Sequence, residues 1–92
     1  MLSYVLRHLG IAEHSAGRLD AARQLLEESR HLRREAGMLP GVAANLVGLA
    51  YIALAQGRND EAVAMVAEAG DLATASGAHG IARKVDEVRT AL

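Results

Sequence analysis

The chain has 92 residues, of which 51% are apolar, and its ten basic and eleven acidic residues give a formal net charge of −1. This length suits a single domain over residues 1–92 with one buried core. Because no half of the chain is strongly basic, the composition argues against nucleic acid as a partner. The absence of cysteine excludes a disulfide framework and thiolate chemistry.

The apolar residues favour helices over strands. Phe and Trp are absent and tyrosine occurs only at Tyr4 and Tyr51, so Ala, Leu, Val and Ile must fill the core. Ala and Leu lead the helix scale, whereas β-branched and aromatic residues are few. The sequence therefore predicts an all-α fold.

Targeting and membrane segments are not recognisable in the sequence. Arg7 and His8 interrupt the apolar N-terminal run before a signal-peptide core could form. No apolar stretch approaches the roughly 18 uncharged residues that a membrane span requires. We therefore expect a cytoplasmic protein that has no membrane partner.

An internal repeat is the most informative pattern. The turn sequence Gly17-Arg18 recurs at Gly57-Arg58, an offset of 57 − 17 = 40 residues. Each copy is predicted to form a helix, a tight turn and a second helix. The expected division is a first repeat over 1–37, a second over 38–77, and a capping helix or partial third repeat over 78–92.

The first predicted helix has apolar residues at steps of three and four, which places them on one face. These residues are Leu2, Val5, Leu6, Leu9 and Ala12. Gly17 then supplies the left-handed residue past the helix end. Asp20 is placed to cap the second helix by accepting a hydrogen bond from its free N–H groups.

The second predicted helix separates an apolar from a charged face. Its buried side is expected to hold Ala22, Leu25, Leu26, Ser29 and Leu32, and its far side Arg23, Glu27, Arg30, Arg33 and Arg34. Gly37 ends the helix. The basic run over 30–34 is compatible with phosphate binding, but neighbouring glutamates neutralise much of it, which favours a solvated outer face.

The third predicted helix has Pro40 in its first turn, where the missing N–H is no loss. From Leu46 to Ala55 it lacks charged and amide side chains, so we expect other helices to enclose it. The fourth helix should begin near Asp60, after a cap at Asn59 or Asp60, and stop at Ser76-Gly77. A fifth has one apolar stripe: Ile81, Val85, Val88 and Leu92.

Both copies resemble tetratricopeptide repeats at the positions of the family's large–small pair, its turn glycine and its packing residues. In the first copy these are Leu9-Gly10, Gly17, Ala22, Leu26 and Ser29, and in the second Leu49-Ala50, Gly57, Ala62, Val66 and Ala69. The resemblance implies a right-handed stack of two helical hairpins closed by a C-terminal capping helix. It also implies a scaffold that binds a protein or peptide.

The offset of 40 exceeds the family's usual period of about 34. Long repeats of this Ala/Leu/Arg-rich kind resemble the helical arms of bacterial LuxR- or MalT-type regulators. That resemblance implies a module that is part of, or derived from, a larger regulatory protein. The alternative that it leaves open is an arm that senses a small ligand or signal peptide for a transcriptional regulator.

Family geometry implies a concave partner-binding face that suits an amphipathic helix or an extended peptide. Its expected residues are Tyr4, Arg7, Ile11, His14, Ala44, Val47, Tyr51, Leu54, Lys84 and Glu87. The alternative is that the fifth helix or a second chain covers Val47, Tyr51 and Leu54, because an open apolar patch of that size is unusual on a monomer.

Catalytic and metal-binding patterns are missing from the sequence. The four histidines lack the i, i+4 pairing of metal ligands on one helical face, so we expect no metal and no cofactor. There is no Gly-x-Ser-x-Gly elbow and no glycine-rich phosphate loop, which argues against an enzyme.

Two repeats and one further helix form a short stack, because such stacks usually need about three units. Flat apolar faces should therefore remain at Leu2, Tyr4 and Val5, or beside the fifth helix. From this we expect self-association as a homodimer.

Overall fold

The computed structural model describes residues 2–92, apart from the side chains of Ser3 and Tyr4. Over this range the chain forms the helices α1 (Leu2–Ser15), α2 (Leu19–Glu35), α3 (Leu39–Ala55), α4 (Asn59–Ser76) and α5 (His79–Ala91). The predicted all-α helical stack is confirmed. None of these helices is both long enough and apolar enough to cross a membrane.

A glycine in the left-handed conformation ends each of the first four helices. The φ angles are 82° at Gly17, 72° at Gly37, 76° at Gly57 and 68° at Gly77, so the turns recur every 37 − 17 = 20 residues. The residue after each glycine donates its N–H to a carbonyl of the last helical turn, as Arg58 does to Ala53 at 2.8 Å. This arrangement satisfies carbonyls that the helix end would leave unpaired.

The predicted side-chain caps at Asp20 and at Asn59 or Asp60 are wrong. The N-cap residues of α2 and α4 are Arg18 and Arg58, and neither helix has a side-chain cap bond. The short glycine turn starts each helix earlier, so these polar residues fall inside the first turn. There the carboxylate of Asp20 still lies near the positive end of the helix dipole, and its Oδ1 accepts a hydrogen bond from Gln56 at 3.0 Å.

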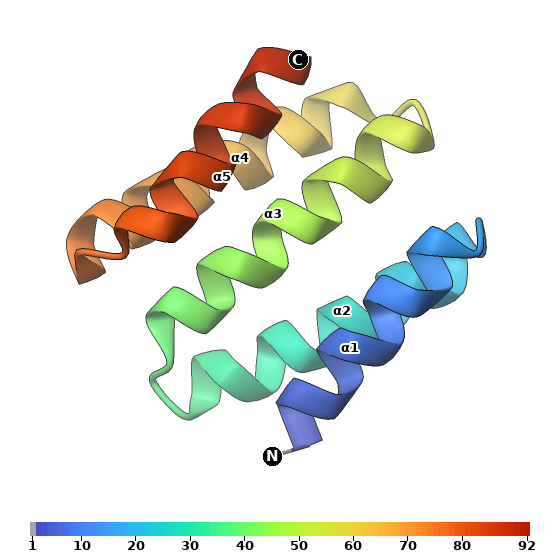
Figure 1. Cartoon of the computed structure of the whole chain (residues 1–92), viewed down its shortest axis with the longest axis horizontal. Helices are drawn as coiled ribbons and strands as arrows, with labels where there is room; N and C mark the ends of the chain where they lie inside the picture. The colour runs from blue at the N-terminus through green and yellow to red at the C-terminus, as the bar shows by residue number, and fades with distance from the viewer. Residues whose placement is uncertain (1) are drawn as a thin grey trace.

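The five helices form two layers, and α3 lies at the centre of the stack (Figure 1). α1, α3 and α5 lie on the near side of this view, α2 and α4 lie behind them, and the hairpins α1/α2 and α4/α5 stand at opposite ends of the stack. Nine residues of α3 are buried: Val42, Ala43, Asn45, Leu46, Val47, Leu49, Ala50, Ile52 and Ala53. The expectation that other helices enclose the third helix is confirmed.

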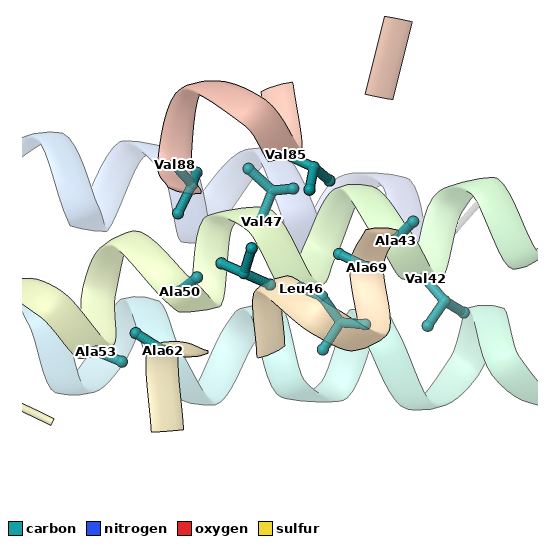
Figure 2. Packing of buried hydrophobic residues seen from close by; sticks show 11 residues of the cluster. Val42, Ala43, Leu46, Val47, Ala50, Ala53, Ala62, Ala69, Val85 and Val88 are labelled. Atoms are coloured by element: carbon teal, nitrogen blue, oxygen red, sulfur yellow. The ribbon is translucent and has the colours of Figure 1, made fainter. Parts of the chain in front are cut away.

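Small residues let α3 approach both of its C-terminal neighbours closely. Figure 2 shows Ala53 beside Ala62 of α4, while Val47 points toward Val85 and Val88 of α5, all within one buried cluster. Alanine at a helix contact allows a short interaxial distance, and valine fills the remaining space. The last helix therefore packs on its own chain.

Leu26 is the main contact between the first hairpin and α3. Its side chain is 2% exposed and forms a second buried cluster with Ala22 and with residues of α3. Glycines on both flanking helices make room for it, since a Cβ added to Gly10 would stand 2.9 Å from its Cγ and one added to Gly48 would stand 3.1 Å from its Cδ1. The side chain of Leu26 on α2 thus packs against both α1 and α3.

Two alanine substitutions test the roles of the last glycines. Gly77 has a φ of 68°, so Gly77→Ala should lower the free energy of unfolding by about 1 to 2 kcal/mol through left-handed strain. Gly80 has open space around its Cα in the first turn of α5, so Gly80→Ala should raise the free energy of unfolding by about 0.5 to 1 kcal/mol. Thermal unfolding of the two variants should shift in opposite directions, and a shared sign would contradict the turn geometry.

Candidate partner-binding face

The residues predicted for the partner-binding face come from α1, α3 and α5, the three helices of one layer (Figure 1). Ile11 and Tyr51 are 40% and 37% exposed, and Lys84 and Glu87 are also exposed. Half-buried positions are Arg7, His14, Ala44 and Leu54. The side chain of Tyr4 lies outside the described residues.

Val47 is only 5% exposed, because α5 covers it with Val85 and Val88 (Figure 2). Leu54 packs against the same cluster and is partly buried. Of Val47, Tyr51 and Leu54, only Tyr51 remains substantially exposed. The apolar part of the candidate face therefore centres on Ile11 and Tyr51, which align at the repeat offset since 11 + 40 = 51.

A buried polar joint connects α2 to α3, and the sequence did not predict it. Asn45 donates from Nδ2 to the Ser29 hydroxyl at 2.8 Å, and both residues are fully buried. Arg33 donates from Nη1 to the Gly41 carbonyl at 3.1 Å and to Asn45 Oδ1 at 3.4 Å. These bonds give partners to the Asn45 amide, the Ser29 hydroxyl and the Nη1 group of Arg33, which the contact removes from water.

The prediction that Arg33 lies on the solvated face of α2 is wrong, because its side chain is 7% exposed. Its stem runs over Gly41, where an added Cβ would stand 2.7 Å from Arg33 Cδ. Gly41 and Asn45 are one helical turn apart at the start of an otherwise apolar helix. That pair is the signal in the sequence that could have located a buried polar partner.

The corresponding joint between α4 and α5 is apolar. Adding 40 to Ser29, Arg33, Gly41 and Asn45 gives Ala69, Ala73, Ile81 and Val85. Three of these are at most 2% exposed and Ile81 is partly buried. The same contact between helices is thus made once with polar and once with apolar side chains.

The basic run over 30–34 is largely paired with carboxylates. Arg30 Nη2 lies 2.6 Å from Glu27 Oε2, and Arg34 Nη2 lies 3.0 Å from Glu68 Oε2 on α4. With Arg33 turned inward, the remaining charges form a mixed outer surface. This arrangement favours the solvated-face interpretation over phosphate binding.

Glu13 and Arg18 form an ion pair across the turn between α1 and α2. The hydrogen bond from the Arg18 guanidinium lowers the pKa of the Glu13 carboxyl, and the nearby positive charge lowers it further. A lowered folded-state pKa contributes stability above the unfolded value and loses it as the pH falls through the folded one. Since the Arg18 side chain of this pair is largely exposed to solvent, we expect a small effect.

Two hollows lie away from the candidate face. One of about 190 Å³ lies between α4 and α5 and includes Asp71, Thr74, Asp86 and Arg89 in its lining. The other is lined by Asp20, Arg23, Gln56 and Arg58. Within residues 2–92, no three His, Asp or Glu side chains are placed to hold a metal ion.

The repeated helical hairpins, their glycine turns and the small residues between their helices agree with the comparison to known families. The family model of the tetratricopeptide repeat matches residues 2–83, which span α1 to α4 and the start of α5. No curated protein and no solved structure matches the chain. The match covers most of the sequence, and the chain belongs to the tetratricopeptide-repeat family.

Proposed function

We propose that the chain is a cytoplasmic scaffold module that binds a protein or peptide. The binding surface is the part of the α1/α3/α5 layer that α1 and α3 form. Tetratricopeptide repeats generally serve as scaffolds for protein interactions. The observation that carries the proposal is Tyr51, which is 37% exposed although nine other residues of its helix are buried. The fold leaves this aromatic side chain available to a partner.

The chemistry of the face suits a partly apolar peptide. Tyr51 combines a broad apolar ring with a hydroxyl group, and aromatic residues of this kind are enriched where proteins bind one another. Ile11 adds aliphatic surface on α1, and Lys84 and Glu87 on α5 offer one charge of each sign. An amphipathic helix or an extended segment with an apolar anchor has matching groups.

Selection of peptides from a random library against the full chain provides probes for this proposal. For the tightest selected peptides, Tyr51→Ala should weaken binding by about 30-fold, the size expected for removal of an anchoring aromatic. Calorimetry of wild type and variant measures the change. Val63→Ala on α4 is the matched control, because Val63 is a large apolar residue that is 51% exposed on another helix.

The control variant should bind the selected peptides as wild type does. Equal losses in both variants would mean that the peptides bind exposed apolar side chains without a preferred face. Unchanged binding by Tyr51→Ala would place the peptide site elsewhere.

The origin of the module in a larger bacterial LuxR- or MalT-type regulator is part of the proposal. Its support is the long hairpin, in which successive turn glycines are 20 residues apart.

The hollow between α4 and α5 supports the second candidate function, an arm that senses a small ligand. A ligand of that hollow should raise the melting temperature as its concentration exceeds Kd, and Asp86→Ala should remove the shift. A shift that survives Asp86→Ala would argue against this second function.

A further inference from the structure

One side of α1 carries an apolar stripe that the chain leaves uncovered. Leu2, Val5 and Leu9 are 58%, 46% and 50% exposed. Ala12, and Ala16 one residue past the end of the helix, continue the stripe with exposed side chains. We call these five residues the α1 seam. Their alternating steps of three and four are the spacing at which two helices pack along a common seam.

The repeat offset aligns the α1 seam with a side of α3 that packs against another helix. Adding 40 to Leu2, Val5, Leu9 and Ala12 gives Val42, Asn45, Leu49 and Ile52, each at most 1% exposed. Leu49 and Ile52 pack with residues of α2, and Asn45 is hydrogen-bonded to α2. On α3 a helix covers this side, whereas on α1 the same side faces solvent.

At the opposite end of the stack, α5 has polar residues at positions that align with apolar residues of α3. Adding 40 to Leu46, Val47 and Ala50 gives Asp86, Glu87 and Thr90, all exposed on α5. An apolar seam packed there would desolvate charged groups without giving them partners. A second copy can therefore match the α1 seam with its own α1 seam, and not through this side of α5.

The sizes of the side chains along the seam match when two copies run antiparallel. Leu2 and Val5 are large and lie at one end, Ala12 and Ala16 are small and lie at the other, and Leu9 lies between them. In an antiparallel pair Leu9 meets Leu9 of the second copy, while each large residue meets a small one. A twofold interface of this kind uses the same patch on both copies.

We propose that the α1 seam joins two copies of this chain into an antiparallel twofold dimer whose axis passes beside Leu9. The contact uses a side of α1 other than the one that carries Ile11. The dimer therefore leaves the α1/α3 face free, and the inference does not rest on the proposed peptide binding.

Sedimentation velocity of the full chain across a wide concentration range tests the dimer. Wild type should form a dimer, and Leu9→Glu should raise the dissociation constant at least about a hundred-fold, because two carboxylates would meet at the axis without partners. Val63→Glu is the matched control, since Val63 is 51% exposed and Leu9 is 50% exposed. This control should dimerise as wild type does, and circular dichroism should show both variants folded.

A wild-type chain that stays monomeric at every concentration would overturn the proposal and leave the seam for a different helix. A dimer that survives Leu9→Glu, or that Val63→Glu disrupts equally, would also overturn it.

Engineered cysteines test the antiparallel arrangement, because the chain has no cysteine of its own. Under mild oxidation Leu9→Cys should form a disulfide between copies, and a mixture of Val5→Cys and Ala12→Cys chains should cross-link with each other. Val5→Cys alone should stay largely unlinked. Efficient linking of Val5→Cys to itself would show parallel pairing and contradict the proposed geometry.

Discussion

Leu26→Ala is expected to lower the free energy of unfolding by about 4 kcal/mol, the upper range for truncation of a buried leucine. Leu26 is 2% exposed and lies against Gly10 and Gly48. Glycines have no side chain that could move into the space, so the cavity should persist. A loss of this size is a large fraction of the stability of a domain of this length. Urea unfolding followed by circular dichroism measures it.

Two alanine substitutions control for this effect. Val66→Ala is made at the aligned position, since 26 + 40 = 66, and removes a smaller buried side chain, so it should cost about half as much. Val63→Ala is made at an exposed position and should change the free energy of unfolding by less than about 0.5 kcal/mol. A loss for Leu26→Ala no larger than that for Val66→Ala would show that the glycine-lined space collapses.

Asn45→Val should destabilise the protein by about 2 to 4 kcal/mol, because it removes partners of buried Ser29 and Arg33. The joint between α4 and α5 supplies a compensated version of the same change. The combined variant Ser29→Ala, Arg33→Ala, Gly41→Ile and Asn45→Val gives the α2/α3 joint the residues of the α4/α5 joint. It should be more stable than Asn45→Val alone, although it carries more substitutions.

Urea unfolding of wild type, Asn45→Val and the combined variant checks this expectation. If the combined variant is the less stable of the two, the α2/α3 and α4/α5 joints are not interchangeable. The polar groups would then specify the joint geometry, and their removal could not be offset by apolar packing.

Sequence periodicity predicted the elements of the fold well where the signal is local. The left-handed glycines, Pro40 near the start of α3, and the apolar run of that helix each reflect the backbone or the immediate surroundings of one segment. Such signals do not depend on how distant parts of the chain pack. These local signals predicted the five helices and the enclosure of the third helix by its neighbours.

Burial was harder to predict where it depends on a neighbouring helix. Leu6 and Leu9 belong to the same apolar pattern, yet Leu6 is 8% exposed and Leu9 is 50% exposed. No α2-like helix of the described chain covers the α1 seam, and periodicity alone cannot reveal which side of an apolar helix will lack a partner. The inward turn of Arg33 was missed because its partners lie on another helix.

The candidate face was predictable only in outline. The repeat offset aligns Ile11 with Tyr51, and both are exposed as a binding role requires. Whether α5 would cover Val47 depended on the packing angle of the last helix, which side-chain spacing does not determine. The structure reduces the apolar part of the predicted face to its α1/α3 portion.

The most direct test of a binding face on α1 and α3 is to map a selected peptide by the amide chemical shifts of the labelled chain. The largest shifts on titration are expected near Ile11 and Tyr51, with smaller ones near Lys84 and Glu87. Shifts concentrated on α2 and α4, or spread evenly over the chain, would contradict a binding face on α1 and α3.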